Sequence, residues 1–495
     1  LYRDQLLNND WWTYNGYLQD GYSRGRLRLQ GGVRYDWQTS KYLGGCVPNN
    51  PIRPDLLPSQ CDEPTNQSTV LDPNTGKVIV GADGQPIMEE LPSFSVWAPR
   101  VSATYDLMGN GKTSIHASYS LYYATKITLA NSLGGLFDQP ALTWGPNLSS
   151  GACDASQTGC WVDSNLDQFI QSGELIGQPS SSSSRFDINT GIFTASGNAV
   201  SKDAKLSRTR EFITGVQHEL IPNLAIGVDY VYRKYDQGTA SYLAGYQPGS
   251  SQFPLSQIYV GPQYYTDPVT GIVAPYYQIC QGCMRPSGIG SITITNLGYN
   301  VYQAVIPTLN KRFSNRWQMN ASATLQTNPG YNVLGTYTNP TGVEFTDGHS
   351  TIARYLIKVS GTYALPYGVN FSGNLNVIDG ANRTVTVNGI RTAYGGVNSS
   401  GQATTISYGN SPQFTFQPAG TTRLQPTKLL DLGAQKVFTF RGGKNRLKVM
   451  FDAFNVFNIN TITSFSSNSL SSANYNAPTA IVPPRVFRIG AQFVF

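Results

Sequence analysis

The last eleven residues of the chain, Arg485–Phe495, alternate between apolar and more polar side chains. In an extended strand successive side chains point to opposite faces, so the apolar residues share one side and Arg488 and Gln492 share the other. An unpaired apolar strand promotes aggregation in water, whereas a closed membrane barrel pairs every edge. The pattern therefore predicts a strand that closes a transmembrane β-barrel, with Phe487 and Phe493 facing lipid.

The same alternation recurs in six pairs of segments upstream, each pair joined by a connection of three to five residues. With the last segment they make thirteen expected antiparallel strands. The expected ranges are Trp11–Tyr22, Arg26–Gln38, Val96–Leu107, Lys112–Thr125, Leu206–Leu220, Leu224–Tyr235, Tyr299–Phe313, Trp317–Thr327, Tyr355–Leu365, Val369–Ile378, Lys428–Phe440, Arg446–Phe457 and Arg485–Phe495. Pro307 interrupts one of them, and we expect a β-bulge there.

The connections between pairs are much longer, from about 27 to about 80 residues. Short turns at one end and long loops at the other are typical of an outer-membrane barrel, with periplasmic turns and extracellular loops. Charged and amide side chains fall on the polar side of each expected strand, where a hydrated lumen would receive them. The candidates for lumen-facing residues are Arg28, Arg34, Asp36, Asp229, Arg233, Asn320, Asn374 and Arg488.

Composition agrees with this interpretation. Charged residues make up only 13% of the chain, about half of the usual share in soluble proteins. No apolar run reaches the roughly 18 residues of a transmembrane helix. The formal net charge of +6 is spread along the chain without a run of Lys and Arg, so nucleic acid is not an expected partner. The expected partner is the lipid of the bacterial outer membrane.

The six cysteines form three close pairs, each within one expected loop: Cys46 and Cys61, Cys153 and Cys160, and Cys280 and Cys283. Because the cell surface is oxidising, we expect three local disulfides. The alternative for the last pair is a metal site, since it forms a C-x-x-C motif. Zinc needs further ligands, and neither a histidine nor a second such motif lies nearby. We therefore expect no metal and no cofactor.

No catalytic constellation is visible, so we expect no enzymatic activity. The three histidines are far apart in sequence, and no nucleophile-elbow motif occurs. Aromatic residues in the expected loops are candidates for a substrate-capture surface, and packing between loops is the alternative. These residues are Trp144, Trp161, Tyr264, Tyr265, Tyr276 and Tyr277.

Several stretches together resemble the C-terminal barrel of TonB-dependent receptors, in particular the Oar-like subgroup. They follow one another in the order and spacing of that family. The stretches are Tyr17–Asp20, Leu29–Asp36, Ala98–Asp106, Gly111–Thr113, Asn310–Trp317, Tyr363–Pro366 and Asp452–Asn458.

The resemblance implies a barrel of about 22 strands around a plug domain. Residues 1–495 would then be the C-terminal part of the barrel, with the plug and the first strands upstream of Leu1. An odd count of thirteen strands agrees, because a bacterial barrel with both ends in the periplasm has an even number. The resemblance also implies a TonB-type energy-coupling partner, which would be contacted through the upstream part.

The function that these features favour is energised uptake of a bulky substrate, such as a carbohydrate, a peptide or a metal chelate, across the bacterial outer membrane. A passive porin or export channel of the same architecture is the first alternative, and a surface adhesion barrel is the second. The sequence upstream of Leu1 would discriminate them, since a plug domain there would exclude a passive pore.

Overall fold

A computed structural model gives the structure of the chain. It describes residues 9–70, 79–125, 142–146, 159–181, 186–189, 192–193, 199–243, 259–266, 273–279, 291–295, 298–332, 350–387, 394–397, 403–406, 414–415, 420–440, 442, 445–470 and 472–495. Within these ranges no helix is long and apolar enough to cross a membrane.

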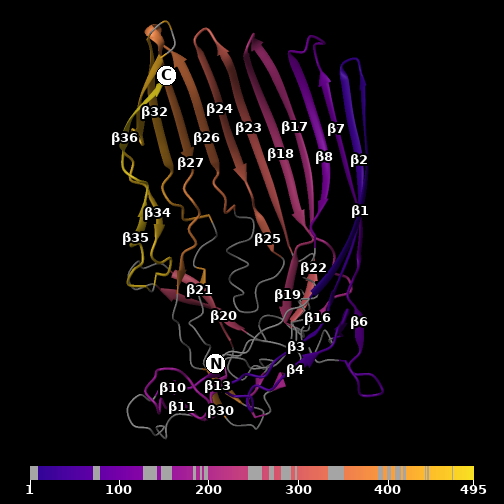
Figure 1. The fold of residues 1–495 in the computed structure, drawn as a ribbon. Helices are drawn as coiled ribbons and strands as arrows, with labels where there is room; N and C mark the ends of the chain where they lie inside the picture. Colours follow the sequence, from indigo (N-terminus) through magenta and orange to yellow (C-terminus); the bar gives the residue numbers. More distant parts are fainter. Residues whose placement is uncertain are drawn as a thin grey trace.

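One large antiparallel sheet dominates the molecule (Figure 1), and the expected thirteen strands and their antiparallel pairing are confirmed. Its strands are β1 (Asn9–Arg24), β2 (Leu27–Tyr42), β7 (Phe94–Asp106), β8 (Thr113–Tyr123), β17 (Arg208–Ile221), β18 (Leu224–Asp236), β23 (Gly298–Ser314), β24 (Trp317–Thr327), β26 (Tyr355–Ala364), β27 (Val369–Ile378), β32 (Thr427–Phe440), β33 (Asn445–Phe454) and β36 (Val486–Val494), and the short β25 (Gly330–Asn332) pairs with β23.

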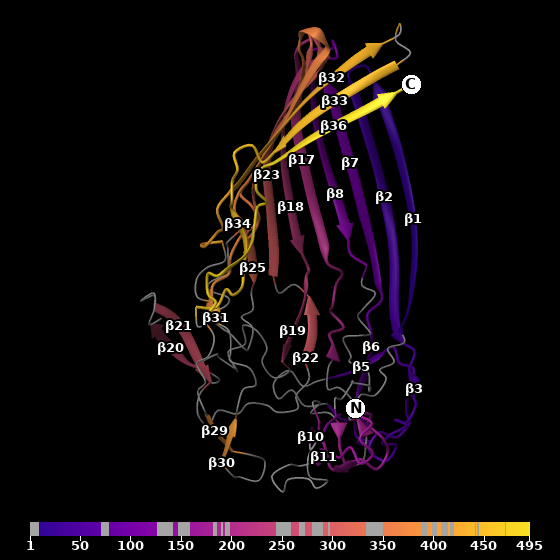
Figure 2. The same ribbon diagram turned by 60° about the vertical axis from the view of Figure 1, so that its left-hand side comes forward.

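These strands lie side by side in the order of the sequence. The sheet is strongly curved, as the two views turned by 60° show (Figures 1 and 2). Among the described residues no ladder joins β1 to β36. The sheet thus has the up-and-down order of a barrel wall, in which every strand is antiparallel to its neighbours.

All short connections lie at one end of the sheet, which we call the turn end, and all long ones lie at the other, the loop end (Figure 1). Tight turns need residues in the left-handed region, and several connections contain one: Gly25, Asn223, Asn315 and Tyr367 have φ values of 57°, 71°, 51° and 65°. The turn containing Tyr367 is a short 3₁₀ helix, η3 (Pro366–Gly368).

Two expectations were wrong. Pro307 causes no bulge, because the register from Val305 to Thr308 is continuous on β24, and the register shift lies further on, between Lys311 and Ser314. The strand expected to end at Phe457 ends at Phe454. Asn455 adopts a φ of 49°, which an extended strand does not allow, and its side-chain oxygen accepts a hydrogen bond from the Ile459 amide at 3.0 Å.

Short strands at the loop end form separate small sheets. They are β3 (Gly45–Val47) with β4 (Gln60–Asp62), β5 (Gln67–Thr69) with β6 (Met88–Glu90), β9 (Leu142–Thr143) with β13 (Ser180–Ser181), β10 (Gly145–Pro146) with β11 (Gly159–Trp161) and β12 (Leu175–Gly177), β14 (Phe186–Asp187) with β15 (Ile192–Phe193), β16 (Ala199–Val200) with β22 (Ser291–Thr295) and β19 (Thr239–Leu243), β20 (Tyr259–Thr266) with β21 (Val273–Ile279), β28 (Thr386–Val387) with β31 (Phe414–Thr415), β29 (Tyr394–Val397) with β30 (Ala403–Ile406), and β34 (Ile462–Phe465) with β35 (Pro478–Ile481).

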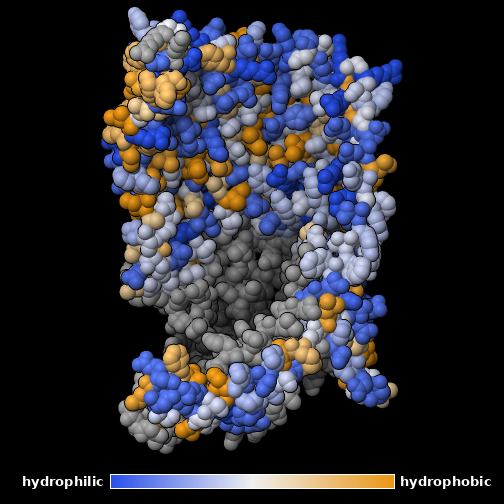
Figure 3. Space-filling view, in the orientation of Figure 1, coloured by the Kyte–Doolittle hydropathy of each residue, from blue (hydrophilic) through white to orange (hydrophobic). Residues whose placement is uncertain are grey.

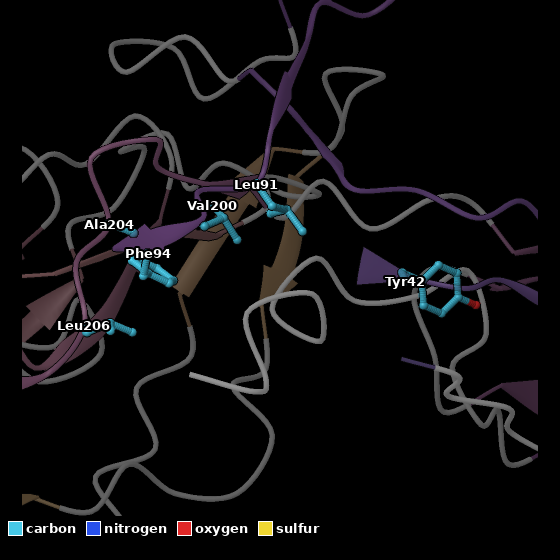
Figure 4. Close-up of a cluster of buried hydrophobic side chains, with 6 residues drawn as sticks. All are labelled: Tyr42, Leu91, Phe94, Val200, Ala204 and Leu206. Atoms are coloured by element: carbon cyan, nitrogen blue, oxygen red, sulfur yellow. The ribbon is translucent and has the colours of Figure 1, made fainter. Parts of the chain in front are cut away.

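The buried apolar residues concentrate at the loop end. One cluster contains Leu91, Phe94, Val200, Ala204 and Leu206, with Tyr42 beside it (Figure 4). The Val200 amide also donates a hydrogen bond of 2.9 Å to the Ser68 hydroxyl. The loop after β2 and the segment before β17 therefore pack on each other, which fixes part of the loop region relative to the sheet.

Candidate functional site

Register divides the sheet into two faces. Residues paired across an antiparallel ladder point to the same side, so the side on which a residue lies can be followed from strand to strand. Arg28 pairs with Thr104, Thr104 with His116, His116 with Gly215, and Gly215 with Asp229. One side of β2 thus continues across β7, β8 and β17 to β18.

Following the pairs to β36 places all eight candidate lumen residues on this same side, which we call the polar face. Charged residues occupy it even in the middle of strands. Several of them were not among the eight candidates: Arg100, His116, Glu211, Lys358 and Lys448. Alternation within their own strands was the signal that could have identified them.

The opposite side, the apolar face, carries Leu18, Val228, Ile489 and Phe493. These large apolar side chains are at least two-fifths exposed, and Ile489 is 80% exposed. Apart from Asp20, the charged residues on this face lie close to strand ends. Hydrophobic residues are visible along the left-hand edge of Figure 3, over β36. Exposed apolar residues in the middle of strands, with all charges but Asp20 near their ends, describe a surface that matches a bilayer.

Several charges on the polar face are paired. Arg34 Nη2 lies 2.7 Å from Asp36 Oδ1, and Arg488 Nη2 lies 2.7 Å from Asp452 Oδ2. Arg233 forms an ion pair with Glu211 on the neighbouring strand. The Arg488–Asp452 and Arg233–Glu211 pairs join neighbouring strands, whereas the Arg34–Asp36 pair lies within β2.

One pair spans a whole strand. His116 Nε2 on β8 lies 3.1 Å from Asp229 Oδ1 on β18, although β17 runs between them. The residue of β17 at this position is Gly215. A Cβ there would lie 2.0 Å from Asp229 Oδ1 and 2.9 Å from His116 Cε1. The contact exists because Gly215 has no side chain.

A groove of about 460 Å³ lies over β1, β2, β7 and β8, and its lining includes Arg34 and Arg100. Arg100 lies opposite Gly32 in the register, which leaves space beside its side chain. Its guanidinium stacks on the Tyr122 ring at 4.6 Å, and no ion pair joins it to another described residue. Ser102, Ser118 and Ser120 also line the groove, and Gln19, Asp20 and Gln30 are among its other polar residues. This groove can offer one cation and several hydroxyls to a polar solute.

The described part of the loop region places two of the candidate capture residues in its interior. Trp144 is 9% exposed and packs in a cluster with Leu57 and Leu142. Trp161 packs against this cluster, and its indole Nε1 donates to Glu174 Oε2 at 3.3 Å. These contacts correspond to the packing alternative. Burial in a loop core depends on contacts between distant segments, which the sequence alone did not reveal.

Hydrogen bonds tie Glu174 into this loop core. Burial works to raise the pKa of its carboxyl, but hydrogen bonds from the Trp161 indole, Ser164 and the Gln171 amide outweigh it and hold the pKa below its usual value. The ionised form of Glu174 therefore organises the loop around Trp161.

The four candidate tyrosines belong to one hairpin, β20 and β21, in which Tyr264 pairs with Pro275, Tyr265 with Ala274 and Tyr276 with Gln263. Tyr264 is 66% exposed. Tyr277 follows Tyr276 in β21. The hairpin lies at the loop end, apart from the large sheet (Figures 1 and 2). Its position leaves Tyr264 free to contact a solute.

Of the three expected disulfides, Cys46–Cys61 is confirmed, with an S–S distance of 1.99 Å, and it links β3 to β4. Cys160 is also disulfide-bonded. Its expected partner Cys153, and both Cys280 and Cys283, lie outside the described residues. In the described ranges no three His, Cys, Asp or Glu side chains gather as they would around a metal ion.

An ion cluster closes the loop end of β27. The Asp379 side chain is 2% exposed, and it pairs with Arg354 at 2.8 Å and with Arg423 at 3.5 Å. Hydrogen bonds from Arg354 lower the pKa of Asp379 from 3.8 to about 2. Both arginines also line a second groove, of about 440 Å³, with Gln326 and Ser350.

With two faces, short turns and long loops in place, the chain has the architecture of an outer-membrane barrel wall. A family model described as an outer membrane beta barrel domain matches residues 2–488. The chain therefore belongs to the outer membrane β-barrel family, and its location is the bacterial outer membrane. A search of curated proteins gave no match.

Solved structures with a similar fold share little sequence with this chain. The ferric-catecholate import receptor Fiu from E. coli K12 is 11% identical, with a TM-score of 0.44 over 98% of this chain and 45% of its own. The outer membrane transporter YddB from Escherichia coli is 12% identical, with a TM-score of 0.42 over 98% and 54%. The siderophore receptor PiuA from Acinetobacter baumannii is 9% identical, with a TM-score of 0.45 over 98% and 43%. The chain spans about half the length of these proteins.

Proposed function

We propose that the polar face lines a hydrated lumen and that the apolar face contacts lipid. The segregation of charge supports this orientation, because an arginine near the bilayer midplane on the lipid side costs roughly 2–4 kcal/mol. Arg34, Arg100, Asp229 and Lys358 all lie away from the strand ends on the polar face. In this orientation the long loops are extracellular and the short turns periplasmic.

We further propose that the function is energised, TonB-dependent uptake of a bulky substrate through a barrel to which this wall belongs. The single observation that carries the proposal is the width of the polar face, which continues over thirteen antiparallel strands. A wall this wide encloses far more space than the interior of a barrel of about eight strands. The motifs that resemble TonB-dependent receptors, of the Oar-like subgroup, support the energised mode. No catalytic role is proposed.

Two surfaces would contact the substrate. The exposed Tyr264 hairpin could take part in capture outside, since aromatic rings stack on sugars and apolar groups. The groove beside Arg100 would bind polar or anionic parts of the substrate inside the lumen. Substrates with both characters include glycans, peptides and metal chelates.

The experiment compares cells that produce the full-length protein with cells that lack it, on mixtures of labelled oligosaccharides, peptides and metal chelates. We expect depletion of one class from the medium only with the protein present, and its loss when an uncoupler collapses the proton-motive force. Uptake that persists with the uncoupler would identify a passive channel. For a passive channel, we also expect liposomes that contain the purified protein to swell in a solution of small sugars. If no substrate class is taken up, and cells that lack the protein no longer attach to surfaces, the protein is an adhesion barrel.

A further inference from the structure

Three cations lie close together on the apolar face, at the loop end of β17 and β18. We call Arg208, Arg210 and Lys234 the basic cluster. Arg208 lies opposite Tyr123 on β8 and Asp236 on β18. Arg210 lies opposite Lys234 in the next layer toward the middle of the sheet. The basic cluster thus occupies the last two layers of side chains on the side that we assign to lipid.

The layers beyond the basic cluster are aromatic and then aliphatic. Phe212 pairs with Tyr232, and Val216 pairs with Val228. Six residues separate Arg210 from Val216, which corresponds to about 20 Å along an extended strand. The basic cluster therefore lies at the height where hydrocarbon gives way to lipid headgroups, and the penalty for a cation there falls to roughly 0–1 kcal/mol.

The carboxylate of Asp236 does not neutralise the basic cluster. Arg208 Nε and Nη2 donate to its two oxygens at 2.8 and 3.0 Å, and Arg210 also pairs with it. Lys234 Nζ lies 4.2 Å from the centre of the Tyr299 ring. Three cations against one carboxylate leave two positive charges. In addition, the buried Nε of Arg210 has no hydrogen-bond partner in the described part of the chain.

Other cations on the apolar face of the described strands stand singly. Lys41 at the loop end lies opposite Asp10. Lys428 pairs with Val377, and at the turn end Lys436 pairs with Val369. A general attraction between the protein and an anionic membrane surface would not require three cations at one place. Their concentration at β17 and β18 indicates a ligand with more than one negative charge.

We propose that the basic cluster binds the phosphate groups of a phosphorylated glycolipid of the outer leaflet. The planar guanidinium of Arg210 can donate two hydrogen bonds to phosphate oxygens, and Lys234 supplies a second charge. Tyr123 and Tyr299 flank the site in its outermost layer, where aromatic rings usually meet headgroups. The acyl chains would run along the Phe212 and Tyr232 layer. The proposal uses the orientation assigned above and is independent of any transport activity.

The experiment measures binding of diphosphorylated lipid A to the purified full-length protein in detergent micelles by native mass spectrometry. We expect R210Q and K234Q to weaken binding by about fivefold each, from about 1 kcal/mol for each cation near an anionic surface. The matched control is K436Q, a single cation on the same face at the turn end, which should leave binding unchanged. D236N removes the carboxylate that pairs with Arg210 and should strengthen binding, whereas a loss of structure would weaken it.

Three results would overturn the proposal. The first is equal binding by wild type and the R210Q/K234Q double variant. The second is equal binding of lipid A with and without its phosphates. Displacement of lipid A by millimolar inorganic phosphate would assign the site to free phosphate instead and would also refute it. Heat-dependent mobility on gels verifies that each variant is folded.

Discussion

Gly215 shows how one small residue determines contacts on the polar face. Its missing side chain lets His116 and Asp229 meet across β17 at 3.1 Å. The pairing of two residues 113 positions apart depends on the register of three strands, and the sequence gives no local sign of it. This is why the sequence predicted a polar position for Asp229 but not its partner.

We expect Gly215→Ala to destabilise the folded protein by about 1–3 kcal/mol, the usual cost of overpacking. The added methyl would meet the Val228 carbonyl at 2.8 Å as well as the His116–Asp229 pair. Unfolding in urea, followed by tryptophan fluorescence in micelles, measures the change. Gly16→Ala is the control, because nothing lies within 4 Å of its Cβ position. Equal stability of the two variants would contradict the structural role of Gly215.

Asp379 gives a prediction about pH. Because its folded-state pKa, about 2, lies below its usual 3.8, its contribution to stability is complete above pH 4 and is lost as the pH falls toward 2. The shift corresponds to about 2 kcal/mol. Urea unfolding between pH 6 and pH 2 should show this loss in the wild type and a smaller one in Asp379→Asn. Identical pH profiles of the wild type and the variant would mean that the Asp379 carboxylate contributes nothing to the free energy of unfolding.

Among the elements, β36 has the clearest division into two faces. Phe487, Ile489 and Phe493 lie on the apolar face, and Arg488 and Gln492 lie on the polar face. Phe495 lies beyond the end of the strand and stacks on Phe493, with ring centres 6.1 Å apart. The strand offers a direct measurement of which side meets lipid.

We expect Ile489→Arg, in the middle of β36, to cost roughly 2–4 kcal/mol, and Phe493→Arg, near the strand end, to cost less. Gln492→Arg, on the other face, should be tolerated. The temperature at which the folded band disappears on gels ranks the three variants. A reversed ranking, with Gln492→Arg the most harmful, would exchange the lipid and lumen sides.

Strands were predictable because their information is local. A repeat of two residues defines a strand, and a run of Gly, Asn or Pro ends it, so all thirteen long strands lay within a few residues of their expected ranges. The short strands of the loop region have no such repeat, and their ranges were not predicted. The bulge expected at Pro307 was wrong, and the choice between packing and capture for Trp144 stayed open, because both depend on neighbours from distant segments.

At the scale of the whole molecule, the separation of turn end and loop end predicts the orientation in the membrane. We expect a cysteine at Val80, 57% exposed at the loop end, to react with an impermeant maleimide on intact cells. A cysteine at Tyr367, 90% exposed at the turn end, should react only after the cells are broken. Reaction at Tyr367 but not at Val80 in intact cells would invert the orientation.

The placement of charges on the apolar face has a mechanical consequence. Cations stand near both ends, Lys41, Lys234 and Lys428 at one and Lys436 at the other, and the middle of the described strands carries no cation on this face. A vertical shift of one or two residues, at roughly 3.4 Å per residue, would move the cations of one end into hydrocarbon. The restoring force acts in both directions, so the wall sits at one depth in the bilayer. A membrane of different thickness would have to deform around it, because the wall itself cannot move up or down.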